Sequence, residues 1–360
     1  MCRAIDDKSI SEVPFKLISE LTYSCNLKCI YCHNPVNKSY FAKELDTVTW
    51  KSIIVKAKEA GVLVNSFTGG EPLLRPDLME LVKFSKDLGL ITRINTNASL
   101  VNEETALQLS RLELDYAQVG LPSLNEKTDE RITEVRGILQ KRIDGIKNLI
   151  RYNIQTSLNV VLTRWNLTTI EEMVMFAEKI GISDLTFQST FLFGRAAANI
   201  KNGILPTTVE MRQVSERIQE LRDRVSLEIH PPHMIYYDGD PMPCSWNREG
   251  IIVVTPNGLV TPCEPASNLF PEVKFDSVSD SSLFDIWNDS EAFKKFENTA
   301  YLPNFCQTCS VIETCRGGCR VVSYLLTGNL MSEDPSCILS EKRKAIELYI
   351  SPQEGSRHEV

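Results

Sequence analysis

Three cysteines within eight residues constrain this chain more than any other feature of its sequence. Cys25, Cys29 and Cys32 follow the strand-like run 15–23 at the spacing C-x3-C-x2-C. A cubane iron–sulfur cluster has four irons, and each iron normally takes one thiolate. Three cysteines on one loop therefore leave one iron without a protein ligand, and that iron can bind a chelating small molecule.

Three other interpretations of this motif have to be weighed. A structural zinc site normally has four N or S ligands, and the fourth is missing here. Cys29, Cys32 and His33 match the C-x-x-C-H pattern of c-type haem attachment. That chemistry needs export, and the N-terminus lacks the apolar core of a signal peptide. The third interpretation, that the cysteines are buried free thiols, is a poor explanation for three cysteines within eight residues. A cluster with one open iron is therefore favoured.

The spacing resembles the signature of the radical SAM superfamily. In that family the amino and carboxylate groups of S-adenosyl-L-methionine bind the open iron of a [4Fe-4S] cluster. An electron passed to the bound sulfonium then releases a 5′-deoxyadenosyl radical, so the hard chemistry belongs to the cofactor. Tyr31 stands where these oxidoreductases place an aromatic side chain against the adenine.

Composition narrows the classes of protein that remain. The chain has 360 residues, is 42% hydrophobic and 24% charged, and carries a formal charge of −8. The negative charge argues against a nucleic-acid binder that depends on phosphate contacts. No apolar run approaches the roughly 20 residues needed to span a bilayer. We therefore expect a cytoplasmic protein without a membrane partner, in which the 11 cysteines are metal ligands rather than disulfides.

Strand-like and helix-like segments alternate over residues 14–200, after a polar tail at 1–13. The strand-like runs are 16–23, 63–68, 90–96, 116–120, 156–163 and 184–189. Apolar residues recur at helical spacing in 47–60, 76–88 and 141–152, the last with Ile143, Ile146, Leu149 and Ile150 on one face. Six such units predict an α/β fold, a partial (β/α)6 TIM-like barrel with its site at the C-terminal ends of the strands.

The sequence changes character after this region. Residues 205–225 predict a helix capped by Thr207 or Thr208, within a bridging helix and linker at 201–240. Residues 241–350 are expected to form a second, cysteine-rich domain, which includes a hairpin at 251–261 with the turn Asn257-Gly258 and a helix at 337–350. Residues 351–360 form a polar tail.

Polar residues at the ends of the predicted strands are candidates for holding the cofactor. The run Gly69-Gly70-Glu71-Pro72 resembles the superfamily's GGEP motif, in which backbone and glutamate bind the methionine amino group, and glycine permits close approach to a ligand. Asn159 and Gln188 are polar where a barrel interior is usually apolar, and a satisfied core residue explains them about as well. The expected cofactor-binding residues are Tyr31, Gly69, Gly70, Glu71, Thr96, Asn97, Asn159 and Gln188.

Seven more cysteines follow in the second half, and only Cys2 is left over. They are Cys244, Cys263, Cys306, Cys309, Cys315, Cys319 and Cys337. With Gly258 their spacing resembles the SPASM domain of peptide-modifying radical SAM enzymes, which carries two auxiliary iron–sulfur clusters. The resemblance implies an outer cluster on Cys306, Cys309, Cys315 and Cys337, and an inner cluster on Cys244, Cys263 and Cys319 with an unassigned fourth ligand. A zinc ribbon would suit Cys306 and Cys309 alone.

The likeness extends over most of the chain to the radical SAM enzymes of pyrroloquinoline quinone biosynthesis. It rests on 20–25, 31–35, Phe193-Gly194-Arg195-Ala196 and Gly317-Gly318-Cys319-Arg320. That family joins glutamate and tyrosine side chains of a ribosomally made precursor peptide through a C–C bond. Cys315 and Val321 depart from it, since the family usually has an acidic residue and a cysteine at these two positions.

The resemblance also implies partners. Only about 14 residues precede the first strand, too few for a leader-binding domain, so a separate small leader-binding protein is expected beside the precursor peptide. A flavodoxin- or ferredoxin-type protein would supply electrons. Candidate bases near Cys244 are His230, His233, Tyr236 and Tyr237, although surface or packing roles explain these four residues better, and no catalytic residue is assigned.

Two other functions remain open from the sequence. A SPASM-type radical SAM oxidoreductase could act on a haem precursor or another small molecule instead of a peptide. A non-enzymatic iron–sulfur or zinc protein is the other alternative, and the motif at 69–72 argues against it because an electron carrier would not need it.

Overall fold

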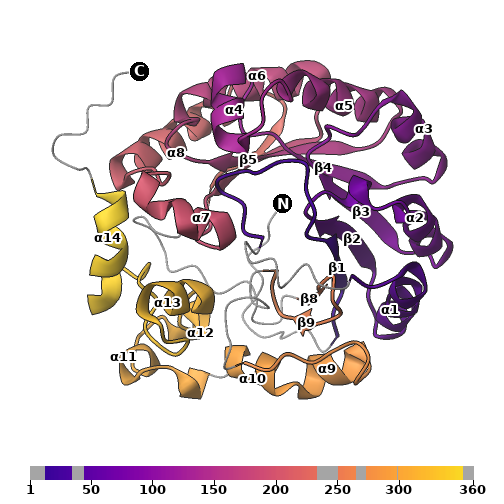
Figure 1. The fold of residues 1–360 in the computed structure, drawn as a ribbon. Helices are drawn as coiled ribbons and strands as arrows, with labels where there is room; N and C mark the ends of the chain where they lie inside the picture. Colours follow the sequence, from indigo (N-terminus) through magenta and orange to yellow (C-terminus); the bar gives the residue numbers. More distant parts are fainter. Residues whose placement is uncertain (1–12, 35–43, 233–249, 265–272, 298, 352–360) are drawn as a thin grey trace.

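One curved sheet with helices on its outer side dominates the structure (Figure 1). The computed structural model describes residues 13–34, 44–232, 250–264, 273–297 and 299–351. The C-terminal helices lie across the opening of the curved sheet. Within the described residues no helix has the length and apolar character needed to cross a membrane.

The sheet has nine strands in the order β7-β6-β5-β4-β3-β2-β1-β8-β9. Neighbouring strands are parallel from β7 through to β8, and β8 pairs with β9 antiparallel. The strands are β1 (Lys16–Thr22), β2 (Val64–Gly69), β3 (Ile91–Thr96), β4 (Tyr116–Gly120), β5 (Thr156–Leu162), β6 (Asp184–Ser189), β7 (Glu228–His230), β8 (Ile251–Val254) and β9 (Val260–Thr261). All parallel strands therefore present their C-terminal ends at one edge.

The helices of the first group lie in the sequence between the strands β1 to β7 and, except for α7, which contacts the cysteine loop, cover the outer face of the sheet (Figure 1). It comprises α1 (Thr47–Glu59), α2 (Leu78–Asp87), α3 (Glu103–Arg111), α4 (Glu126–Thr133), α5 (Leu139–Arg151), α6 (Ile170–Ile180), α7 (Gly194–Asn199) and α8 (Thr208–Arg222). Capping side chains define where several of these helices begin. At α1 the Asp46 side chain accepts from the Thr49 N–H, and at α8 Thr207 forms a capping box with Glu210. Thr207 is thus the cap of the predicted helix 205–225.

The second group of helices is short and belongs to the cysteine-rich region. It comprises α9 (Leu283–Asp289), α10 (Glu291–Glu297), α11 (Asn304–Gln307), α12 (Ile312–Cys315), α13 (Arg320–Thr327) and α14 (Lys344–Ile350). The prediction of one helix over 337–350 was wrong in its first half, because a 3-10 turn at Glu341–Arg343 precedes α14 and Ser340 caps that turn.

The partial barrel predicted from six β-then-α units is confirmed, and the sheet extends beyond it on both sides. β7 pairs with β6 at one edge. The predicted hairpin joins the other edge, where Lys16 of β1 pairs with Ile251 of β8. The hairpin thus forms part of the barrel sheet, and the boundary at residue 241 stays a prediction.

The predicted apolar face of α5 packs against the core. Ile146 and Leu149 are buried, and Ile143 and Ile150 are half-buried and pack against the same core. Arg142 and Gly145 are buried as well. An added Cβ on Gly145 would lie 2.1 Å from the Ala98 carbonyl oxygen, so the bare glycine allows α5 to approach the loop that follows β3.

Candidate active site

The three cysteines of the C-x3-C-x2-C motif lie in the loop that follows β1, at the C-terminal edge of the sheet. Cys25, Cys29 and Cys32 all line one cavity of about 670 Å³. None of the nine described cysteines forms a disulfide. The loop therefore presents three free thiols to a space that can hold a large cofactor and part of a substrate.

The Gly-Gly-Glu run after β2 holds the start of this loop. The Gly70 N–H donates to the Thr22 carbonyl at 2.6 Å, and the Glu71 N–H donates to the Ser24 carbonyl at 2.8 Å. An added Cβ on Gly70 would lie 2.1 Å from the Ser24 oxygen, and one on Gly69 would lie 2.2 Å from the Thr22 oxygen. The close approach that makes glycine necessary here is therefore to the protein's own backbone, and not only to a ligand.

A second support comes from the start of α7. The Arg195 N–H donates to the Cys32 carbonyl, and Arg195 Nε donates to the Cys29 carbonyl, each at 2.9 Å. An added Cβ on Gly194 would lie 2.2 Å from the Asn34 carbonyl oxygen. Backbone bonds from Lys28 and Ile30 to the end of α4 complete the frame. The loop conformation is thus fixed from three sides without help from the thiols.

The thiols themselves are suited to a metal cluster and poorly suited to any other state. Burial raises the pKa of Cys29 to about 12, Cys32 and Cys25 act in the same direction, and the Arg142 guanidinium acts against it. Burial likewise raises the pKa of Cys25 and of Cys32. Three thiols that line one cavity and are costly to ionise there gain most from a cation that takes them as thiolates. The donor set therefore fits an iron–sulfur cluster.

Glu71 is fully buried, and all of its described contacts are to the protein. Its carboxylate accepts from Thr96 Oγ1 at 2.7 Å and from the Asn97 N–H at 2.8 Å. Burial nevertheless raises the pKa of Glu71 above its usual value. Glu71 does not line the cavity, whereas Gly69, Gly70, Thr96 and Asn97 do. Its role in holding the methionine amino group stays a prediction, and its observed contacts tie the end of β2 to the end of β3.

The other expected cofactor contacts also reach the cavity. Tyr31 lines it and forms a side-chain hydrogen bond with Cys29. Asn159 Nδ2 donates to Gln188 Oε1 at 2.9 Å, and both residues line the cavity. Asn159 Oδ1 is buried and has no hydrogen-bond partner among the described residues. A buried acceptor without a partner can accept a hydrogen bond from a bound ligand. This favours the cofactor-binding interpretation of Asn159 over that of a satisfied core residue.

Arg142 is a site residue that sequence analysis missed. It is 1% exposed, pairs with the fully buried Asp129 at 2.5 Å, and also lines the cavity. Its Nε donates to the Asn97 carbonyl at 3.2 Å, and its Nη2 donates to the Gly120 carbonyl. Arg142 is three residues before Gly145 and seven before Leu149, so helical spacing puts it on the buried face of α5. An arginine in that position needs a buried acceptor or counter-charge, and this could have marked it as a site residue.

The six described cysteines of the second half line the same cavity as the first three. Burial raises the pKa of Cys306 to about 11, and Cys315 and Cys337 act on it in the same direction. The outer cluster on Cys306, Cys309, Cys315 and Cys337 stays a prediction. Cys263 is buried and Cys319 half-buried, but Cys244 lies outside the described residues, so the inner cluster stays a prediction.

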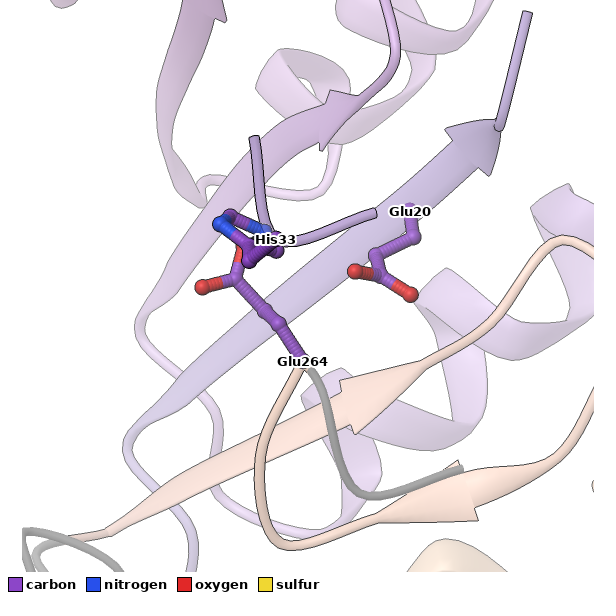
Figure 2. Close-up of side chains that lie close together, drawn as sticks. All are labelled: Glu20, His33 and Glu264. Carbon is purple, nitrogen blue, oxygen red and sulfur yellow. Dashed lines mark ion pairs between the residues drawn. The ribbon is translucent and has the colours of Figure 1, made fainter. Parts of the chain in front are cut away.

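A second polar cluster lies beside the cysteine loop (Figure 2). Glu20 comes from β1, His33 follows Cys32, and Glu264 follows Cys263. One ligand atom from each lies within 4.8 Å of the other two. His230, the described member of the predicted bases, does not line the cavity and lies 3.9 Å from Glu228 Oε1; His233, Tyr236 and Tyr237 are outside the described residues.

Family models match both halves of the chain. The model of the radical SAM superfamily matches residues 19–177. The model of the SPASM iron-sulfur cluster-binding domain matches residues 244–310. The first match contains Cys25, Cys29 and Cys32, and the second contains Cys263, Cys306 and Cys309, which line the same cavity.

The chain is also similar to individual proteins of known name or structure. A PqqA peptide cyclase of Gluconobacter oxydans (strain 621H) is 34% identical over 336 residues, which are 93% of this chain and 93% of that protein. The crystal structure of Streptococcus suis SuiB bound to S-adenosylmethionine has a TM-score of 0.73 at 19% identity, covering 91% of this chain and 78% of SuiB. AnSMEcpe with bound AdoMet and Cp18Cys peptide has a TM-score of 0.67 at 15% identity, covering 93% and 96%.

Proposed function

This chain belongs to the radical SAM superfamily, and from that premise we propose that it modifies a ribosomally made precursor peptide. It is an enzyme whose cofactors are a [4Fe-4S] cluster with S-adenosyl-L-methionine and the auxiliary clusters of its SPASM domain. The modification is removal of hydrogen from the peptide followed by a C–C or other crosslink.

One observation carries this proposal. The cavity that Cys25, Cys29 and Cys32 line is the same cavity that Cys263, Cys306 and Cys319 line, and its volume is about 670 Å³. That volume lies within the range of about 300 to 1,000 Å³ that is typical of small-molecule and cofactor sites. A substrate between the two cysteine groups would be within reach of both cofactor sites. The relatives' name, PqqA peptide cyclase, supports a peptide as that substrate.

The residues of the chain have distinct tasks in this reaction. When bound, the cluster with S-adenosyl-L-methionine supplies a 5′-deoxyadenosyl radical on one-electron reduction. Cys25, Cys29 and Cys32 hold the cluster and leave one iron open. Gly69 and Gly70 fix that loop, and the amides of Asn159 and Gln188 present hydrogen-bonding groups to the cofactor. The wall of β1 to β6 excludes water, which would otherwise quench a radical.

Anaerobic incubation of cluster-loaded protein with S-adenosyl-L-methionine and dithionite tests the enzyme assignment. We expect 5′-deoxyadenosine from the native chain and none from Cys32→Ala. Mass spectrometry of candidate peptides tests the substrate, and the expected result is a peptide that has lost two hydrogens. Formation of 5′-deoxyadenosine with loss of hydrogen from a tetrapyrrole, and from no peptide, would contradict the peptide proposal.

The partners and the compartment belong to the same proposal. A flavodoxin- or ferredoxin-type reductant is included because reductive cleavage needs one external electron. A separate small leader-binding protein would deliver the peptide, and a titration of each protein against the chain by calorimetry tests both. The absence of disulfides among the described cysteines supports a cytoplasmic location.

A further inference from the structure

The cluster of Glu20, His33 and Glu264 contains a buried carboxylate, that of Glu20, with only one hydrogen bond among the described residues. Glu20 is 1% exposed, and one of its oxygens accepts from the Tyr23 hydroxyl at 3.1 Å. Its other oxygen has no hydrogen bond among the described residues. The Glu264 carboxylate faces it, and within the described part of the chain neither carboxylate forms an ion pair with lysine or arginine. Lys16 acts on Glu264 electrostatically without forming an ion pair with it, and a buried carboxylate such as Glu20 that faces a second carboxylate is costly.

The spacing of the donor atoms fits a shared ion. His33 Nε2 lies 4.0 Å from Glu264 Oε1, and the three ligand atoms all lie within 4.8 Å of one another. Ligand atoms about 2.1 Å from one ion are about 3 to 4 Å apart, so movements of under about 1 Å would close the set. Figure 2 shows the three side chains projecting toward one space from β1 and from two loops.

We propose that Glu20, His33 and Glu264 bind a divalent first-row transition ion. One imidazole and two carboxylates suit Mn²⁺, Fe²⁺ or Zn²⁺, whereas an imidazole is a poor ligand for Ca²⁺ or Mg²⁺. Three protein ligands leave coordination positions open, and His33 and Glu264 line the cavity. The ion would therefore present its open positions to the cavity, as catalytic metal sites do.

The site would also join parts of the molecule that are distant in sequence. Glu20 belongs to the barrel, His33 directly follows the first cysteine group, and Glu264 directly follows Cys263 of the second. An ion bound by these three side chains would connect the three segments to one another. This inference does not depend on the identity of the substrate.

Mn²⁺ titration of the cluster-loaded, desalted protein tests the proposal, with free Mn²⁺ followed by electron paramagnetic resonance. We expect one Mn²⁺ bound per chain and a Kd raised about 10-fold or more by Glu20→Gln, by Glu264→Gln or by His33→Gln. The matched control is Glu228→Gln, because the exposed Glu228 lies 3.9 Å from His230 and, among the described residues, these two belong to no group of three possible metal ligands. This variant should bind Mn²⁺ like the native chain.

Two results would overturn the proposal. One is a native chain that binds no Mn²⁺, or binds it equally well in all three variants. The other is Glu264→Gln changing the resonance of an auxiliary cluster while Mn²⁺ binding stays as it was, which would make Glu264 a ligand of that cluster instead. Iron and sulfide content, measured for every variant, separates loss of the ion site from loss of the clusters.

Discussion

The Glu71 carboxylate accepts the backbone N–H of Asn97 at 2.8 Å and so joins the ends of β2 and β3. Asn97 in turn donates from Nδ2 to Asn26 Oδ1 at 2.9 Å, and Asn26 directly follows Cys25. A buried carboxylate that does not itself line the cavity is therefore connected, through Asn97, to the loop that carries Cys25. Glu71 is a positioning residue by these contacts.

Glu71→Gln should weaken the binding of S-adenosyl-L-methionine about 10-fold while the iron content stays the same. The glutamine amide would place an N–H₂ donor against the donors of Thr96 and Asn97, which costs about 1 to 3 kcal/mol for a buried group. Equilibrium binding to the cluster-loaded protein measures the effect. The control is Glu80→Gln on the exposed surface of α2, and equal affinities for both variants would contradict the prediction.

Gly70→Ala should destabilise the fold around the first cluster. The new Cβ would lie 2.1 Å from the Ser24 carbonyl oxygen, and both backbones would have to move apart. Thermal unfolding and iron content should both fall. Gly120→Ala is the matched control, because an added Cβ there meets nothing within 4 Å; an equal loss of stability in both variants would argue against backbone packing as the reason for Gly70.

Asp129→Asn should lower the free energy of unfolding by about 3 kcal/mol, because it leaves the Arg142 guanidinium buried without a counter-charge. The double variant Asp129→Leu with Arg142→Met should cost less than the two single changes together, and urea unfolding measures both. Asp87→Asn is the control, since the exposed Lys83–Asp87 pair contributes under about 1 kcal/mol. Additive costs in the double variant would show that the pair is not coupled.

Lys16→Met should stabilise the protein at pH 7, and the gain should shrink as the pH rises toward 10.5. Burial and then the charge of Arg93 lower the pKa of Lys16 from its usual value of 10.5. The native state therefore holds the charged form at a cost, and that cost disappears once the native amine loses its proton. Urea unfolding at pH 7 and pH 10 measures the change. Exposed Lys58→Met should show no such pH dependence.

Cys306→Ala should remove the outer auxiliary cluster and lower the iron content by about a third, if each of the three sites holds a comparable cluster. Cys306, Cys315 and Cys337 line the same cavity and belong to the proposed ligand set, so the loss of Cys306 would leave that set incomplete. Iron analysis after anaerobic reconstitution measures the loss. Cys2→Ala should leave the iron content unchanged, and equal iron in both variants would remove Cys306 from the ligand set.

The spacing of the cysteines and the order of strands and helices were readable from the chain because both are local. Three thiols in eight residues and six β-then-α units need no knowledge of distant contacts. They gave the family, the partial barrel and the cofactors, which the comparisons bear out. The buried pair of Arg142 and Asp129 was not predicted, because these two side chains meet only where α4 and α5 pack together.

What only the tertiary structure decided is how separate stretches share one space. Nothing in the spacing of residues 20, 33 and 264 suggests that their side chains meet, because strand β8 brings the last of them to β1 through pairing across more than two hundred residues. The hairpin likewise looked like part of another domain until its hydrogen bonds placed it in the barrel sheet. Motifs made of neighbouring residues can be recognised from the sequence alone. Contacts between distant segments depend on sheet register and helix packing, which are set by the whole fold.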